Sequence, residues 1–451
     1  MRHSPQHQPR HEHLSHQPPQ TPPGRPRRGL RRTLAVTSVV ALAAVTAACG
    51  GGGADDGMIE LSVATFGEFG YEELYAEYER QNPDVRIVPR KTGQGGPYHQ
   101  ALFTKLGGNS GLEDVVAVEE GYMADVLDAS QRFHDLTEIG PDGVGPDRWL
   151  DWKYEGGVDT DGRLIGYGTD IGPLAMCYRK DLFAEAGLPS EPEEVKPLFE
   201  TWESYFEAGD EFLAGSDGVA WFDSAAQIFN AMHNQLEVGY FDEDNTLTVG
   251  SNPGIRQNWD RVTAAVQRGQ SAGLVAMSNE WNSGFQESAF ATKTCPAWML
   301  GIIEGQAGDE HAGDWAVTDA FPGGGGNWGG SYLAVPTQTE HPEEAAALAA
   351  WLTAPEQQIK AFEASGAFPS QVEALDAPEL TSTTDDYFGG APTGEVFAAQ
   401  ARKVEHAQYK GPGDGQIQEN AATPALQTVE QGATPEEAWR RFVDSAERIA
   451  R

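Results

Sequence analysis

The sequence predicts an α/β fold of two lobes, each a β-sheet flanked by helices, and three observations support this prediction. The chain has 451 residues, and a single hydrophobic core rarely supports a chain of that length. Apolar strands and amphipathic helices alternate between residues 59 and 118. A further strand–turn–helix unit, from Gly168 to Pro189, lies near the middle of the chain and extends this alternation beyond a first lobe.

The first lobe is predicted to contain a parallel sheet. Strands and helices are expected in alternation at 59–65, 71–80, 85–88, 98–106 and 114–118. In the first helix, Leu74, Tyr75 and Tyr78 form the apolar stripe. Right-handed crossovers bring the carboxyl ends of parallel strands to one edge, where such sheets bind ligands. The polar and aromatic residues that follow these strands are therefore site candidates: Phe66, Glu68, Glu119 and Glu120.

Residues 1–48 have the layout of an export signal. Five arginines between Arg25 and Arg32 precede an uncharged run, 33–48, that is too short to cross a membrane comfortably. The residues around Cys49 resemble a bacterial lipoprotein signal, in which that cysteine is lipidated and becomes the first mature residue. Ordinary secretion with a free Cys49 is the alternative. Residues 49–57, rich in glycine, are expected to form a flexible tether.

The charge balance argues against nucleic acid as a partner. The chain contains 31 basic and 68 acidic residues, a net charge of −37, and such a surface repels phosphate backbones. The spacing of cysteine and histidine predicts no metal site, and no phosphate loop or other motif predicts a cofactor.

The segment 168–189, GTDIGPLAMCYRKDLFAEAGLP, combines a bend, a strand and a short helix. Gly168 and Gly172 mark the bend, and Asp170 is the one charge inside it. Its Asp-x-Gly-Pro, Tyr-Arg-Lys-Asp-Leu-Phe and Ala-Gly-Leu-Pro patterns resemble the crossover segment of the extracellular solute-binding proteins that serve carbohydrate ABC importers. In that family the segment passes between the lobes beside the ligand cleft. The resemblance therefore makes Asp170 a candidate ligand contact.

Later segments carry the same resemblance and imply where the lobes begin and end. The Gly-rich stretch 322–330 and the motifs at 281–284 and 295–299 look like the loops that return the chain to the first lobe. The resemblance covers most of residues 58–451 and implies a periplasmic-binding-protein-like fold with multiple hinge crossings. It implies a first lobe of residues 58–170 and 296–340, and a second lobe of residues 171–295 and 341–451.

A neutral oligosaccharide offers flat C–H faces and a rim of hydroxyls. Its site needs aromatic platforms together with carboxylates and amides. The candidate aromatic residues are Trp221, Trp281, Trp298 and Trp328, and the candidate amides are Asn282 and Asn327. Core packing is the alternative for each tryptophan, and a solvated loop charge is the alternative for Glu119, Glu120 and Asp170.

The two remaining cysteines, Cys177 and Cys295, have two interpretations. An exported protein can enter an oxidising compartment, so they either form a disulfide or stay as two buried thiols.

The resemblance implies the binding component of an ABC sugar importer. A monomer would capture a short oligosaccharide by closure of its lobes and deliver it to permease subunits in the membrane. Residues 281–328 most resemble the binding proteins for β-linked disaccharides such as cellobiose or xylobiose. The alternatives are a secreted glycosidase, which also needs aromatic residues and carboxylates, a binding protein for a solute other than sugar, and a structural lipoprotein without a cleft.

Overall fold

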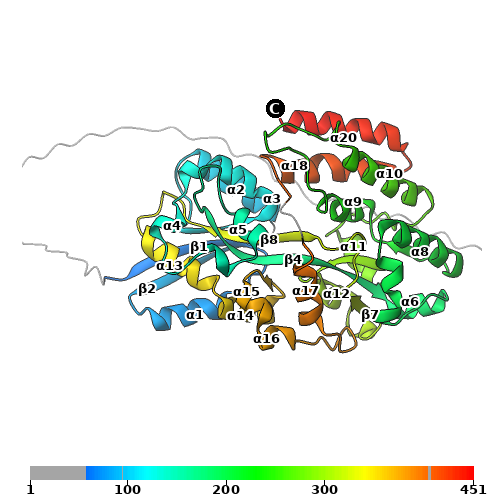
Figure 1. The fold of residues 1–451 in the computed structure, drawn as a ribbon, viewed down its shortest axis with the longest axis horizontal. Coiled ribbons are helices and arrows are strands. Elements are labelled where there is room, and N and C mark those ends of the chain that lie inside the picture. Colours follow the sequence, from blue (N-terminus) through cyan, green and yellow to red (C-terminus); the bar gives the residue numbers. More distant parts are fainter. Residues whose placement is uncertain (1–56, 94, 405–407) are drawn as a thin grey trace, which may run out of the picture. The chain divides into compact units, whose positions relative to one another are not determined.

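The computed structural model describes residues 57–93, 95–404 and 408–451. The predicted leader, the lipidation of Cys49 and all but the last residue of the predicted tether lie outside these residues. The described strands form a nine-stranded sheet in the order β2-β1-β3-β8-β4-β6-β5, and β7 and β9 pair with β4 beside this path (Figure 1). The strands are β1 (Ile59–Phe66), β2 (Val85–Thr92), β3 (Val115–Glu119), β4 (Gly166–Arg179), β5 (Ala220–Phe222), β6 (Phe290–Pro296), β7 (Trp315–Thr318), β8 (Asn327–Ala334) and β9 (Phe368–Pro369).

The first three strands confirm the predicted parallel sheet. β1 pairs in parallel with both β2 and β3, and β8 joins β3 in the antiparallel direction. Alternate residues of β3 enter two different cores, with Val115 and Ala117 on one face and Val116 and Val118 on the other. A strand that is covered on both faces needs a continuous apolar run, which is what β3 has.

Helices cover both faces of these strands. One face packs against α1 (Glu72–Gln81), α4 (Leu136–Ile139), α13 (Pro342–Leu352) and part of α14 (Pro355–Ser365). The opposite face packs against α2 (Gly95–Gly107) and α3 (Glu120–Asp128). In α1 the buried residues are Leu74 and Tyr78, four positions apart, as the 3.6-residue period requires.

Strand β4 belongs to both halves of the sheet. Its first half pairs with β8, beside which it lies in Figure 1, as far as Pro173. From Leu174 it pairs with β6. The register with β8 shifts twice between Gly168 and Pro173, so the strand is irregular where its partners change. Gly172 is required at this change because a Cβ atom there would lie 1.9 Å from the carbonyl oxygen of Trp328.

The second half of the sheet also separates two cores. Leu174, Met176 and Tyr178 of β4 face one core, and Ala175 and Cys177 face the other. Residues of α6 (Lys180–Glu185), α7 (Pro192–Val195), α8 (Trp202–Gly215), α9 (Ala225–His233), α10 (Pro253–Gln267), α18 (Asp414–Ile417), α19 (Thr423–Glu430) and α20 (Pro435–Ile449) build the first. Residues of α11 (Asn279–Gln286), α12 (Met299–Ala307), α15 (Val372–Asp376), α16 (Pro378–Thr381) and α17 (Thr393–Ala401) build the second. Across the described ranges, no helix is both long enough and apolar enough to span a bilayer.

The packing differs from the predicted lobe boundaries in two segments. Helix α13, predicted in the second lobe, contributes Ala345 and Leu348 to the core of β1 and β3. Strand β7, predicted in the first lobe, pairs with the second half of β4. Tertiary contacts, which the local sequence does not report, decide which half of the sheet each segment joins. The predicted boundary at 170/171 lies at the irregular part of β4, where the strand changes partners.

Cys177 and Cys295 form a disulfide between β4 and β6. Cys177 pairs with Lys293 and Cys295 pairs with Ala175, so the cysteines are diagonal neighbours on antiparallel strands. Their Cα atoms are 5.6 Å apart, within the usual range for a disulfide, and the bond joins positions 118 residues apart in sequence.

Replacing both cysteines, Cys177→Ala with Cys295→Ala, should lower the free energy of unfolding by about 2–5 kcal/mol, because the unfolded chain loses a long-range constraint. Urea unfolding of residues 58–451 under non-reducing conditions measures this change. Thiol titration of the denatured, unreduced wild type is the control. Two titratable thiols would contradict the bond.

Candidate functional site

Two adjoining cavities lie where the end of β3, the start of β8, helix α9 and the segment after α17 meet, and both are lined by Asn234 and Lys410. The Glu120 cavity has a volume of about 270 Å³, and its lining includes Glu120, Trp152, Asn234, Asn327, Tyr332 and Lys410. The Asp414 cavity has a volume of about 220 Å³, and its lining includes Glu119, Gln227, His233, Trp328, Lys410 and Asp414.

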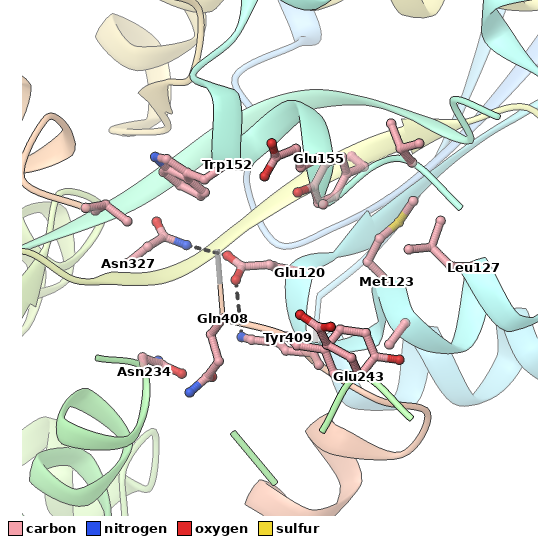
Figure 2. A pocket seen from close by; sticks show the side chains of 16 residues that line it. Glu120, Met123, Leu127, Trp152, Glu155, Asn234, Glu243, Asn327, Gln408 and Tyr409 are labelled. Atoms are coloured by element: carbon pink, nitrogen blue, oxygen red, sulfur yellow. Dashed lines mark hydrogen bonds and ion pairs between the residues drawn. The ribbon is translucent and has the colours of Figure 1, made fainter. Parts of the chain in front are cut away.

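Glu120 joins three segments in the first cavity. Its carboxylate accepts a hydrogen bond from Asn327 Nδ2, and its Oε1 lies 3.2 Å from Lys410 Nζ (Figure 2). Asn327 is buried, and its Oδ1 accepts a hydrogen bond of 2.8 Å from the backbone N–H of Gly172 in β4. The side chain of Asn327 therefore ties the irregular part of β4 to the carboxylate in the cavity.

Glu119 and Glu120 sit side by side because β3 ends where α3 begins. Glu119 is the extended residue that precedes α3, so both carboxylates lie at a helix N-terminus, where negative charge is favoured. The backbone N–H of Glu119 donates to His99 Nε2 over 3.0 Å, which fixes this turn. The sequence therefore presents one carboxylate to each cavity from adjacent positions.

The Asp414 cavity holds more carboxylates than cations. Burial raises the pKa of Glu119 and of Asp414 to about 7 each, and in both cases nearby Lys410 opposes the shift. Burial alone lowers the pKa of Lys410, but the charges of Glu120 and Asp414 outweigh it and the net shift is upward. Asp414 Oδ2 is buried and has no hydrogen-bond partner within the described part of the chain. A ligand hydroxyl could donate to it.

Neutral groups complete the lining of this cavity. His233 is buried and stacks on Tyr240 with ring centroids 3.8 Å apart. Burial lowers the pKa of His233 to about 3, so at neutral pH the ring offers one donor and one acceptor. Neither ring nitrogen has a partner among the residues that the structure describes. Such groups suit hydroxyls, which also donate and accept.

Trp328 supplies the aromatic surface of the Asp414 cavity, where it is partly buried. Its ring is perpendicular to that of Trp298, with centroids 6.4 Å apart. Trp298 is also partly buried, and its Nε1 donates to the carbonyl oxygen of Trp328 over 3.3 Å. Trp298 thus supports Trp328 without lining either cavity.

Four more predicted site residues line neither cavity. Phe66 packs against Tyr98 and His99, and Glu68 is exposed and forms an ion pair with Lys91. Asp170 accepts a hydrogen bond from Thr169 Oγ1, and Asn282 is partly buried on α11. None of these four lines a cavity with Glu119, Glu120, Asn327 and Trp328, although burial and, to a smaller extent, the charge of Asp170 raise the pKa of Glu119, and their predicted role as ligand contacts stays a prediction.

Two predicted tryptophans are corrected. Trp221 has no exposed surface and packs on Phe183 and Tyr205 in a core. Trp281 is equally buried, and its Nε1 donates to Asp223 Oδ2 over 2.8 Å. Neither ring can stack on a ligand in this structure. Trp221 lies in β5 and Trp281 in α11, so the Asn and Gly that follow Trp281 did not indicate a loop.

One group of lining residues that the sequence did not predict comes from the segment after α17. Lys410, Asp414, Gln418 and Glu419 all line the Asp414 cavity. Gln418 and Glu419 begin a π-helical segment, Gln418–Ala422, that connects α18 with α19. Such segments are frequent at functional sites. The only signal in the sequence was the cluster of polar residues at 414–420.

The sheet has two halves that share strand β4, and carboxylates, amides and an aromatic ring line the two cavities. This arrangement defines a two-lobed solute-binding fold, as predicted. The chain belongs to the bacterial extracellular solute-binding protein family, whose profile matches residues 73–386. The resemblance seen in the sequence is therefore confirmed.

Three known proteins are similar to this chain. The crystal structure of an extracellular solute-binding protein of family 1 is 46% identical with a TM-score of 0.82, covering 87% of this chain and 100% of that one. An arabinooligosaccharide-binding protein of Halalkalibacterium halodurans is 23% identical over 84% of this chain and 86% of its own. The binding protein of B. animalis subsp. lactis in complex with β-1,6-galactobiose is 20% identical, with a TM-score of 0.70 over 87% of this chain and 98% of its own, and shares the fold.

The raised pKa values predict a pH dependence of stability. Glu119 and Asp414 keep their protons up to about pH 7 in the folded chain but lose them near 4.5 and 3.8 when unfolded. Unfolding between these values releases protons, so stability should fall as the pH rises from about 4 to about 7. In calorimetry of the ligand-free protein, Glu119→Gln with Asp414→Asn should lose less stability over this range than the wild type.

Glu73→Gln, at an exposed acid on α1, is the matched control and should follow the wild type. An equally steep fall in the double variant would show that other groups set the pH dependence.

Proposed function

We propose that this chain is the sugar-capturing component of an ABC importer and that it binds a short oligosaccharide in the Glu120 and Asp414 cavities. The observation that carries the proposal is the lining of the Asp414 cavity, where the ring of Trp328 lies with carboxylates, amides and a neutral histidine. An indole face suits the C–H face of a sugar, and the polar groups suit its hydroxyls. Membership of the solute-binding family supports capture of a small solute.

The sugar itself is a finer part of the proposal. The resemblance of residues 281–328 to binding proteins for β-linked disaccharides favours cellobiose or xylobiose. The relative from Halalkalibacterium halodurans, named for arabinooligosaccharides, favours an arabinose oligomer as a further candidate. The solved relative with β-1,6-galactobiose supports a β-linked disaccharide. Two adjoining cavities, of about 270 and 220 Å³, would suit adjacent sugar units.

Delivery and location complete the proposal. The family is extracellular by description, which supports export. A monomer anchored through a lipid on Cys49 would hold the binding body near the permease subunits that receive the sugar. Export with a free Cys49 is the alternative to the anchor.

A panel of sugars tests the proposal. Residues 58–451 are screened by thermal shift and calorimetry against cellobiose, xylobiose, arabinotriose and β-1,6-galactobiose, and against amino acids and peptides, with product analysis of each sugar mixture. A ligand that binds the native state raises its melting temperature. A shift with the sugar left intact supports the proposal. Cleavage would replace it with a glycosidase, and a shift only with amino acids or peptides would replace it with another solute.

Replacing Trp328 by Ala should weaken binding of the sugar that the panel identifies by about 1–3 kcal/mol, because an aromatic surface in the cavity is lost. Calorimetric titration measures the change, and a melting curve checks that the variant is folded. Trp351→Ala is the matched control, since this tryptophan packs on Tyr78 outside the cavities. Equal affinity in the wild type and Trp328→Ala would assign Trp328 to packing alone.

A further inference from the structure

We propose that Lys293, a buried residue behind the Asp414 cavity, is a positioning residue that orients Gln227 and Trp328 for ligand binding. The inference rests on the proposed function, because it assigns a role in that same site. Lys293 lies on β6 with no exposed surface and does not line the cavity itself. It would act only through the two neighbours that do.

The contacts of Lys293 connect it to both cavity residues. Its Nζ donates a hydrogen bond of 2.9 Å to Gln227 Oε1. The same nitrogen lies 5.7 Å from the ring centroid of Trp328, within the range of a cation–π interaction. Gln227 and Trp328 both line the Asp414 cavity. One ammonium group therefore bonds an amide and lies within cation–π range of an indole, and the two come from distant parts of the chain.

Asp223 and Trp281 hold Lys293 in place. The Nζ of Lys293 lies 3.1 Å from Asp223 Oδ2, and both side chains are fully buried. The same oxygen accepts a hydrogen bond of 2.8 Å from Trp281 Nε1. The tryptophan that the sequence placed at the ligand thus orients the carboxylate that fixes the lysine.

A buried ion pair needs an explanation beyond stability. Removing two charges from water is costly, and apolar residues of similar size often serve a core equally well. Burial lowers the pKa of Lys293, and the charge of Asp223 opposes this shift. We therefore infer that the ion pair of Lys293 and Asp223 is retained, in spite of this desolvation cost, because it orients neighbouring side chains.

The chemistry of the ammonium decides the orientation of Gln227. An ammonium only donates hydrogen bonds, so the amide of Gln227 must turn its oxygen toward Lys293. Its NH₂ group then remains as the donor available to the cavity, and the ligand group that meets it must be an acceptor. A neutral residue at position 293 would let the amide rotate and present either end.

The experiment removes the charges without leaving one unpaired. Lys293→Met alone strands Asp223 in the core and is expected to destabilise the fold. Lys293→Met with Asp223→Asn keeps a hydrogen-bond acceptor for Trp281 and buries no charge. Thr292→Val is the matched control on the same strand, because its hydroxyl contacts Tyr205 and the carbonyl oxygen of Trp221, outside both cavities.

Binding of cellobiose, xylobiose, arabinotriose and β-1,6-galactobiose is measured by calorimetric titration, together with melting temperature. We expect the double variant to melt near the wild type but to bind about tenfold more weakly, a usual size for residues coupled in one network. Thr292→Val should bind as the wild type does. Adding Gln227→Ala should cost less affinity in the double variant than in the wild type, because Gln227 is already released.

Unchanged affinity in a folded double variant, or full additivity with Gln227→Ala, would overturn the inference. A ligand-free measurement separates it from the proposed function. In protein labelled with 5-fluorotryptophan, the resonance of Trp328, assigned through Trp328→Phe, should move or broaden in the double variant while that of Trp351 does not. If no sugar binds even the wild type, the proposed function fails, and an unchanged Trp328 resonance would also overturn the inference.

Discussion

The hydrogen bonding of one buried strand is the constraint on which the rest of the structure depends. Every residue of β4 except Asp170 is buried, so its backbone groups must find partners inside the protein. No single neighbour supplies them all, and the strand changes from β8 to β6 near Pro173. At this change the side chain of Asn327 accepts the free N–H of Gly172, which also brings Asn327 to Glu120. The site therefore lies beside the point where the sheet changes partners.

The site combines this backbone constraint with an excess of buried acid. Lys410 lies between the carboxylates of the two cavities, and its Nζ is 3.2 Å from Glu120 Oε1. Its charge opposes the rise that burial causes in the pKa of Asp414. Within the described residues, Asp414 Oδ2 and both ring nitrogens of His233 in the lining have no hydrogen-bond partner. Buried groups without partners cost free energy in the empty protein. A ligand rich in hydroxyls would recover that cost, which links the electrostatics of the cavities to the proposed oligosaccharide.

The sequence predicted those features that depend on residues close to one another in the chain. Burial on both faces requires β3 to be continuously apolar, so the strand and the carboxylates at its end follow from a short window of sequence, whereas the helix that begins at Glu120 was not predicted. Trp281 was assigned wrongly because the Asn and Gly that follow it lie within a helix, and Trp221 because tertiary packing buries the strand that carries it. Lys410 and Asp414 lie almost 300 residues from Glu119 and Glu120, and no pattern in the sequence reports a contact over such a separation.

The π-helical segment at Gln418–Ala422 has a consequence for how specificity can change. A π turn contains one residue more than an α-helical turn over the same path. Deleting one residue there would convert the segment to α-helix and rotate the residues before it by about 100° relative to α19. The side chains that Gln418 and Glu419 present to the cavity would then be exchanged for their neighbours, while the core of α19 and α20 kept its place. A change of length by a single residue, without any substitution, could thus redirect which solute the protein prefers.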